Sequence, residues 1–96
     1  MSESPLTRTV TICNPQGLHA RPADLFVKTA IQFQSRIEVV WGRERVDGKS
    51  ILAILTLAAC QGTELVIEAT GPDAAAALDA LTKLVSDDFD EVGTVE

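Results

Sequence analysis

Apolar and polar residues alternate along the chain with two different periods, and the changes between them predict seven elements. A period of two, typical of half-buried strands, runs through residues 6–13, 36–41, 43–46 and 64–70. Apolar spacings of three and four residues, typical of amphipathic helices, occupy about residues 20–33, 50–59 and 74–86. Turn-forming residues separate these segments. The expected element order is therefore βαββαβα.

The one-sided apolar stripes of these elements predict an α/β (α+β) open-faced sandwich, in which a four-stranded sheet carries three helices on one face. The expected core residues include Ala23, Phe26, Val27 and Ala30 in the first helix, with Ile31 or Phe33 as additions. In the strand over 36–41 they are Ile37, Val39 and Trp41, and in the last helix Ala77, Leu78, Leu81, Leu84 and Val85. The apolar pattern does not fix the order of the strands in the sheet.

The length and composition predict a single domain over residues 1–96. Hydrophobic residues make up 46% of the chain, as in folded globular proteins. We expect an ordered core over about residues 6–86, with Asp73 as the capping residue of the last helix. Residues 87–96 are expected to form an acidic, solvated end, since negative charge is unfavourable at a helix C-terminus.

The charge and the apolar runs exclude several classes of function. A formal net charge of −6 and only four Phe and Trp residues argue against nucleic acid as a partner. The longest nearly apolar run, residues 51–60, is too short to span a bilayer, so we expect no membrane insertion. Cys13 and Cys60 are interpreted as two thiols in a reducing cytosol, although a disulfide between them stays open at this stage.

The candidate chemistry is concentrated at the only histidine, His19, which lies where a loop ends and the first helix begins. Exposed amides and the positive end of the helix dipole make such a place an anion site, and Arg21 adds a cation. One histidine in a protein is usually incidental. No second histidine is present to complete a metal site, and a hydrolase triad has little support, because Asp24 lies about a turn beyond His19. A nucleophilic imidazole at an anion site remains, which suits the carrying of a phosphoryl group.

Three motifs together resemble those of the histidine-containing phosphocarrier proteins (HPr) of the phosphoenolpyruvate-dependent sugar phosphotransferase system. Gly-Leu-His-Ala-Arg-Pro-Ala stands unbroken over residues 17–23, Lys-Ser-Ile over 49–51, and Gln-Gly over 61–62. The order and spacing of the motifs are similar to those of the family from about residue 6 to about residue 85. The resemblance implies an antiparallel sheet and a phosphocarrier that has no catalytic activity of its own, no metal and no bound cofactor.

The resemblance also implies roles for single residues. His19 matches the histidine that is phosphorylated, and Arg21 and the backbone amides of Ala20 and Arg21 would hold the phosphate. Ser50 is a favoured N-cap residue, and it matches a serine that the HPr kinase/phosphorylase modifies in many members. The partner-docking residues would be Ile51, Leu52, Leu55 and Lys28, and the first turn of the second helix would be partly exposed.

The expected partners are phospho-enzyme I, which is charged from phosphoenolpyruvate, as donor and a histidine of an enzyme IIA domain as acceptor. We expect a cytoplasmic monomer. Two alternatives stay open: a regulatory carrier in a nitrogen-type or incomplete phosphotransferase chain, and a metabolite-binding α+β regulatory domain. Ile31 and Asp24 depart from the family pattern, which leaves the identity of the partners open.

Overall fold

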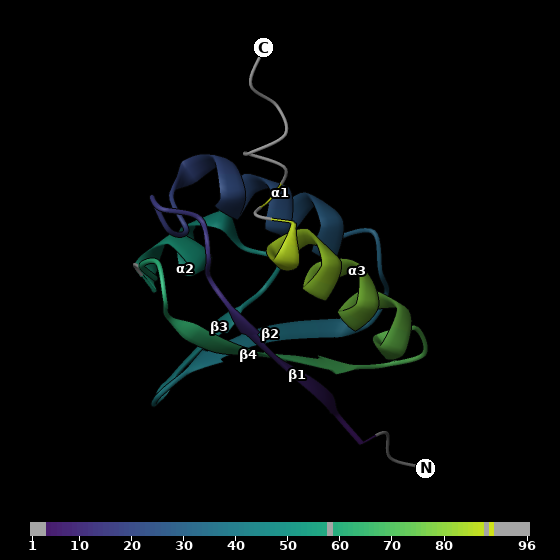
Figure 1. Ribbon diagram of the computed structural model, residues 1–96. Helices are drawn as coiled ribbons and strands as arrows, with labels where there is room; N and C mark the ends of the chain where they lie inside the picture. The colour runs from purple at the N-terminus through teal and green to yellow at the C-terminus, as the bar shows by residue number, and fades with distance from the viewer. Residues whose placement is uncertain (1–3, 58, 88, 90–96) are drawn as a thin grey trace.

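The computed structural model describes residues 4–57, 59–87 and 89, and it confirms the order βαββαβα. The elements are β1 (Leu6–Thr11), α1 (Ala20–Ala30), β2 (Arg36–Trp41), β3 (Glu44–Asp47), α2 (Ile51–Thr56), β4 (Glu64–Thr70) and α3 (Ala74–Ser86). The three helices lie on one side of the sheet (Figure 1). The open-faced sandwich expected from the one-sided apolar stripes is therefore confirmed.

The sheet is antiparallel throughout, and its strands lie in the order β1-β4-β2-β3. In this register Val10 stands opposite Leu65, and Val39 stands opposite Ile67. All four of these side chains are buried. Because side chains alternate between the two faces of a strand, this register places these four side chains together on the face that the helices cover.

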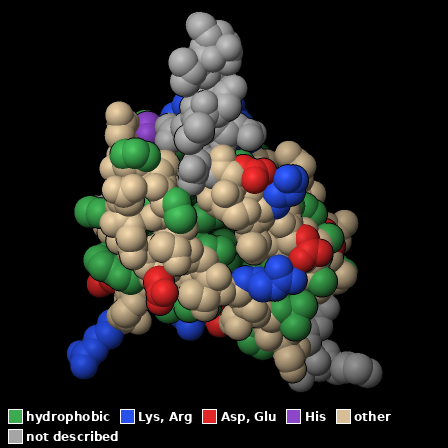
Figure 2. All heavy atoms as spheres, in the orientation of Figure 1, with side chains coloured by type: hydrophobic (Ala, Val, Ile, Leu, Met, Phe, Trp, Pro, Cys, Tyr) green, Lys and Arg blue, Asp and Glu red, His purple; other side chains and the backbone are tan. Residues whose placement is uncertain are grey.

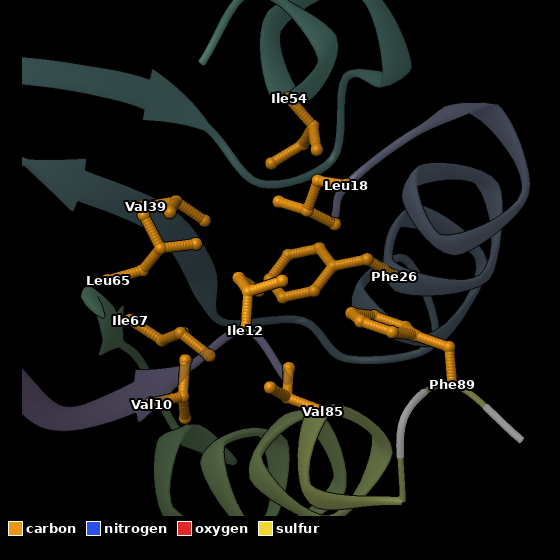
Figure 3. Close-up of a pocket in the computed structure, with 10 residues that line it drawn as sticks. All are labelled: Val10, Ile12, Leu18, Phe26, Val39, Ile54, Leu65, Ile67, Val85 and Phe89. Carbon is orange, nitrogen blue, oxygen red and sulfur yellow. The ribbon is translucent and has the colours of Figure 1, made fainter. Parts of the chain in front are cut away.

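The core is mostly aliphatic and extends past the limit of residue 86 that we expected. Figure 3 shows Phe89 beside Phe26 and close to Val85 at the edge of the core, and Phe89 has an exposed fraction of 0%. The expectation of a wholly solvated acidic end is therefore wrong at Phe89, because its ring buries a large apolar area. The remainder of that expectation, residues 88 and 90–96, lies outside the described residues.

Two helices end earlier than the apolar pattern predicted. Helix α1 ends at Ala30 instead of Phe33, because the N–H groups of Gln32 and Phe33 donate to carbonyls only three residues back. Ile31 is consequently 58% exposed, whereas Phe33 is partly buried against the core. Helix α2 ends at Thr56 instead of residue 59.

Two side chains lie differently from the prediction. Trp41 was expected in the core beside Ile37 and Val39, but it lies at the turn end of the β2–β3 hairpin and is 43% exposed. Asp73 holds the N-cap position of α3 without making a side-chain cap. Its carboxylate instead accepts hydrogen bonds from the α1–β2 loop, which competes for the same oxygens.

The fold also bears on the composition arguments. Cys13 and Cys60 are both exposed, and they form no disulfide with each other. Over residues 4–57, 59–87 and 89, no helix combines the length and the apolar character that crossing a membrane requires.

Candidate functional site

The segment that carries the histidine, here called the His19 loop (residues 14–19), is closed by bonds within itself. The N–H of Gly17 donates to the carbonyl of Asn14 at 3.0 Å, and the Nδ2 of Asn14 donates to the carbonyl of Gly17 at 2.7 Å. The N–H of His19 also donates to the Gly17 carbonyl, at 3.0 Å. Asn14 is 1% exposed, so a buried amide side chain holds the turn that delivers His19 to the helix.

A second segment, here called the Gln61 turn (residues 59–62), holds the His19 loop from outside. The N–H of Leu18 donates to the carbonyl of Ala59 at 2.9 Å, and the Nε2 of Gln61 donates to the carbonyl of Cys13 at 2.9 Å. The two segments touch so closely that a Cβ added at Gly17 would lie 2.3 Å from the Ala59 oxygen. Gly17 also has a φ of +70°, which glycine adopts most easily. This position therefore needs glycine for two independent reasons.

His19 is the N-cap residue of α1, with an extended backbone at φ −83° and ψ −167°. Its carbonyl accepts the N–H of Ala23 at 3.0 Å, which is the first hydrogen bond of the helix. Its side chain makes no capping hydrogen bond to the helix. The imidazole is partly exposed, and Figure 2 shows it at the surface in purple. The expected position of His19 at the start of the helix is confirmed.

The electrostatics of this helix start favour an anion. The N–H groups of Ala20 and Arg21 have no acceptor within a helix that begins at Ala20, and Pro22 has no N–H to satisfy. The first turn contains no acidic residue, and Arg21 is exposed. The helix dipole adds positive potential at the same place. Asp24 lies one turn on, and Lys28 pairs with it at 3.1 Å, which offsets its charge.

Helix α2 lies beside α1, and its start is fixed by polar contacts. The Oγ of Ser50 accepts the N–H of Ala53 at 3.2 Å, so the N-cap interpretation of Ser50 is confirmed. The Nζ of the preceding residue, Lys49, donates to the carbonyl of Phe33 at 2.8 Å. This bond connects the start of α2 to the segment that follows α1.

The first turn of α2 presents apolar side chains to solvent. Leu52 is 78% exposed and Ile51 is 37% exposed, whereas Leu55 is partly buried and packs on the core. The expectation that these three residues are partly exposed is confirmed. Exposed apolar groups that lie together are a common mark of a surface that another protein covers.

The residues that hold the His19 loop were not identified as site residues from the sequence. In the sequence Asn14 is a turn-forming residue and Gln61 belongs to the Gln-Gly motif, and neither pattern assigns a role at the site. The signal in the sequence was the Gln-Gly motif, which a turn alone does not explain. Their contacts with the loop join residues up to 48 apart in the chain, which no local pattern can predict.

The comparisons with known proteins agree with this geometry. The family model described as "PTS HPr component phosphorylation site" matches residues 6–87. The phosphocarrier protein HPr of Neisseria meningitidis is 43% identical over 86 residues, which are 90% of this chain and 97% of that protein. The phosphocarrier protein NPr of Shewanella violacea is 42% identical over 86 residues, which are 90% of this chain and 94% of that protein.

Solved structures give the same result for the fold. HPr of Thermoanaerobacter tengcongensis has a TM-score of 0.87 and 42% identity, and the match covers 90% of this chain and 97% of that one. The same organism's HPr has also been solved as a dimer, with a TM-score of 0.72 over 83% of this chain and 92% of that one. The chain therefore belongs to the HPr family, the phosphocarrier proteins of the phosphoenolpyruvate-dependent phosphotransferase system.

Proposed function

We propose that this chain accepts a phosphoryl group on His19 from phospho-enzyme I and passes it to a histidine of an enzyme IIA domain. The observation that carries the proposal is the position of His19 as the N-cap of α1, with no side-chain cap and no acidic residue in the first turn. Membership in a phosphocarrier family supports the same chemistry.

In the proposed transfer, the neutral imidazole of His19 attacks phosphorus through Nδ1, the nitrogen used in the family. A new P–N bond forms as the P–N bond to the donor histidine breaks. The phosphoryl group carries negative charge on its three outer oxygens throughout an in-line transfer. The amides of Ala20 and Arg21, together with the Arg21 guanidinium, are placed to stabilise that charge.

The proposed docking surface is the exposed first turn of α2, with Ile51 and Leu52 at its centre. The partly buried Leu55 follows in the next turn of the helix. Lys28 adds a basic group on the neighbouring helix, although in the free protein it pairs with Asp24. We propose that phospho-enzyme I and the enzyme IIA domain use this surface in turn. Both steps would then take place in the cytoplasm, where enzyme I receives its phosphoryl group from phosphoenolpyruvate.

Intact-mass measurement after incubation with phosphoenolpyruvate and enzyme I tests the transfer. We expect the mass of one phosphoryl group to be added, and we expect acid to remove it, because phosphohistidine is acid-labile. His19→Ala should gain no mass. A phosphoprotein that is stable in acid but labile in base, or a His19→Ala protein that still gains mass, would contradict the proposal.

A nitrogen-type chain is the second candidate, and the similarity to the NPr of Shewanella violacea supports it. The two branches differ in the acceptor, so the experiment adds either a sugar-type or a nitrogen-type enzyme IIA domain to the phosphorylated protein. The acceptor that removes the phosphate within seconds identifies the branch. Transfer of the phosphoryl group to both acceptors at the same rate would mean that the chain serves both branches.

We further propose that Ser50 is a regulatory phosphorylation site for an HPr kinase/phosphorylase. A phosphoserine carries about two negative charges at neutral pH and would lie beside Ile51 and Leu52 on the docking surface. It should therefore slow uptake of phosphate at His19 through lost docking. Uptake from enzyme I by Ser50→Asp is compared with that by Ser50→Ala. Equal rates would leave Ser50 as a helix cap only.

We also propose that the working carrier is a monomer, because His19, Arg21 and the first turn of α2 all come from one chain. Light scattering on the purified protein tests this. A mass of two chains at micromolar concentration would instead match the dimer known for the Thermoanaerobacter relative.

A further inference from the structure

Two amide side chains from different parts of the sequence donate hydrogen bonds to the backbone that leads to His19. Asn14 bonds across the loop to the Gly17 carbonyl at 2.7 Å. Gln61 bonds from the neighbouring turn to the Cys13 carbonyl at 2.9 Å. Both acceptors are backbone carbonyls within six residues of His19, so each bond acts on the path of the chain into the site.

The Asn14 bond fixes the last turn before His19. The Gly17 carbonyl that accepts the Asn14 amide also accepts the N–H of His19, so one oxygen joins the buried side chain to the backbone of the histidine. Asn14 is 1% exposed. A hydrogen bond between buried groups is strong, and without the Asn14 amide the buried Gly17 carbonyl would have one partner fewer.

The Gln61 bond holds the residue just before the His19 loop, Cys13, against the Gln61 turn. It acts together with the Leu18–Ala59 backbone bond, and the close approach of Gly17 to Ala59 leaves no room for a side chain at residue 17. Gln61 is an exposed residue. Removal of its side chain therefore should loosen the contact between the His19 loop and the Gln61 turn without disturbing the core.

We propose that Asn14 and Gln61 are positioning residues for the phosphoryl transfer. They hold His19 at the helix start with its imidazole in line for attack, and they do this through the backbone of residues 13–17. This inference rests on the proposed function of His19. Displacing a reacting group by about 1 Å can slow a reaction by about a hundredfold, because a near-attack geometry is lost.

The experiment compares Asn14→Ala, Asn14→Asp, Gln61→Ala and Gln61→Glu with wild type. The acidic variants keep the shape of the amide but lack its donor when they are ionised. Transfer from phospho-enzyme I is followed by rapid quench over a range of donor concentrations. Here kcat is the maximal rate constant of the transfer, and KM is the donor concentration that gives half of it. For both Asn14 variants we expect kcat to fall by about tenfold to a hundredfold. KM should change by less than about twofold, since the α2 surface stays intact.

The Gln61 variants should show a smaller loss of kcat in the same direction, because the Leu18–Ala59 bond still holds the loop. Ser35→Ala is the matched control, since Ser35 is also a buried polar residue with hydrogen bonds but lies beyond the far end of α1. It should lower stability and leave kcat unchanged. Equal kcat for wild type and both Asn14 variants would overturn the proposal. A loss of kcat in Ser35→Ala as large as that in Asn14→Ala would reduce Asn14 to a structural residue.

Amide hydrogen exchange at Leu18 gives a readout that does not depend on phosphate. Its N–H donates to Ala59, so exchange in Asn14→Ala and Gln61→Ala should speed up by about tenfold relative to wild type, for an opening about 1.4 kcal/mol easier. Unchanged exchange in both variants would overturn the positioning role. If wild type instead gains no phosphate on His19, the proposed function fails, and the exchange measurement still decides whether the two amides hold the loop.

Discussion

The two ends of α1 are held by the rest of the protein in opposite ways. At the N-terminal end, polar side chains bind the incoming loop and leave the first amides of the helix without a side-chain cap. At the C-terminal end, side chains bind the backbone that leaves the helix. Lys49 donates to the Phe33 carbonyl, and Asp73 accepts the N–H groups of Gln34 and Ser35.

Ser35 and Asp73 make the C-terminal end a closed unit. The hydroxyl of Ser35 donates to the Asp73 carboxylate at 2.5 Å, and the N–H of Asp73 donates back to that hydroxyl at 3.2 Å. The hydroxyl of Ser35 and the backbone N–H groups of this loop hold the pKa of Asp73 below its ordinary value. Every one of these donors has an acceptor within the protein, so this end offers little to a ligand.

The difference between the ends separates stability from function within one helix. A helix start that bonds its own side-chain cap has fewer donors for a phosphate, and a helix start in a loosely held loop has no fixed direction. The His19 end avoids both, because Asn14, Gln61 and Ala59 bind the chain before the helix, and His19 makes no side-chain cap. Substitutions at the two ends should therefore have different consequences for transfer, even where their costs in stability are similar.

The largest effect is expected at the N-terminal end, in Gly17→Ala. The added Cβ would lie 2.3 Å from a backbone oxygen at a φ of +70°. The left-handed backbone costs about 1–2 kcal/mol, and the steric overlap adds about 1–3 kcal/mol. Urea unfolding should show a total loss of about 2–5 kcal/mol. Transfer should be lost as well.

Gly42→Ala is the control for this substitution. Gly42 also has a positive φ, +60°, but a Cβ there would meet nothing within 4 Å. Only the cost of the left-handed backbone, about 1–2 kcal/mol, is expected, with transfer unchanged. Equal losses in the two alanine variants would show that the close approach of Gly17 to Ala59 is unimportant.

At the C-terminal end, Ser35→Ala should reduce the free energy of unfolding by about 1–3 kcal/mol, because the hydroxyl of the buried Ser35 makes two hydrogen bonds with Asp73 that alanine cannot make. Ser86→Ala is the exposed control, since its hydroxyl bonds only the Lys83 carbonyl at the surface, and it should change stability by less than about 0.5 kcal/mol. Both variants should carry phosphate as fast as wild type. Slow transfer in Ser35→Ala would show that the two ends are not independent.

The lowered pKa of Asp73 predicts a pH dependence of stability. A carboxyl whose pKa is lower in the folded than in the unfolded state stabilises the protein at pH values above the ordinary pKa of that carboxyl, which is 3.8 for Asp73. That contribution disappears as the pH falls through the lowered native pKa. The difference in urea midpoint between wild type and Asp73→Asn should therefore be largest near neutral pH and should shrink in acid. A difference that is constant over this range would exclude Asp73 as its source.

The smallest effect is expected for Lys49→Met, which keeps the apolar stem and removes the bond to the Phe33 carbonyl. Stability should fall by about 0.5–1.5 kcal/mol. Lys28→Met is the control, because Lys28 makes an exposed pair with Asp24, worth about 0.3–0.5 kcal/mol. Thermal unfolding of the two variants measures the difference. A larger loss of stability in Lys28→Met than in Lys49→Met would show that the Lys49–Phe33 bond does not stabilise the contact between the start of α2 and the end of α1.

The sequence by itself determined the elements, their order and the place of the histidine. Apolar periods of two and of three to four residues identify strands and helices because side chains repeat with those periods. Pro22 in the first turn and Ser50 before the second helix mark helix starts through local backbone geometry. These features depend on residues close together in the chain, which is why a pattern could predict them.

Only the tertiary structure decided which partner each buried or polar group finds. Phe89 lies past the end of α3 yet completes the core beside Phe26, and Asp73 turns from its own helix to the loop after α1. The bonds that hold the His19 loop join the segment after β1, the loop and the Gln61 turn across long stretches of chain. Such contacts depend on the order of strands β1-β4-β2-β3, which packing and loop geometry set and which no local pattern encodes.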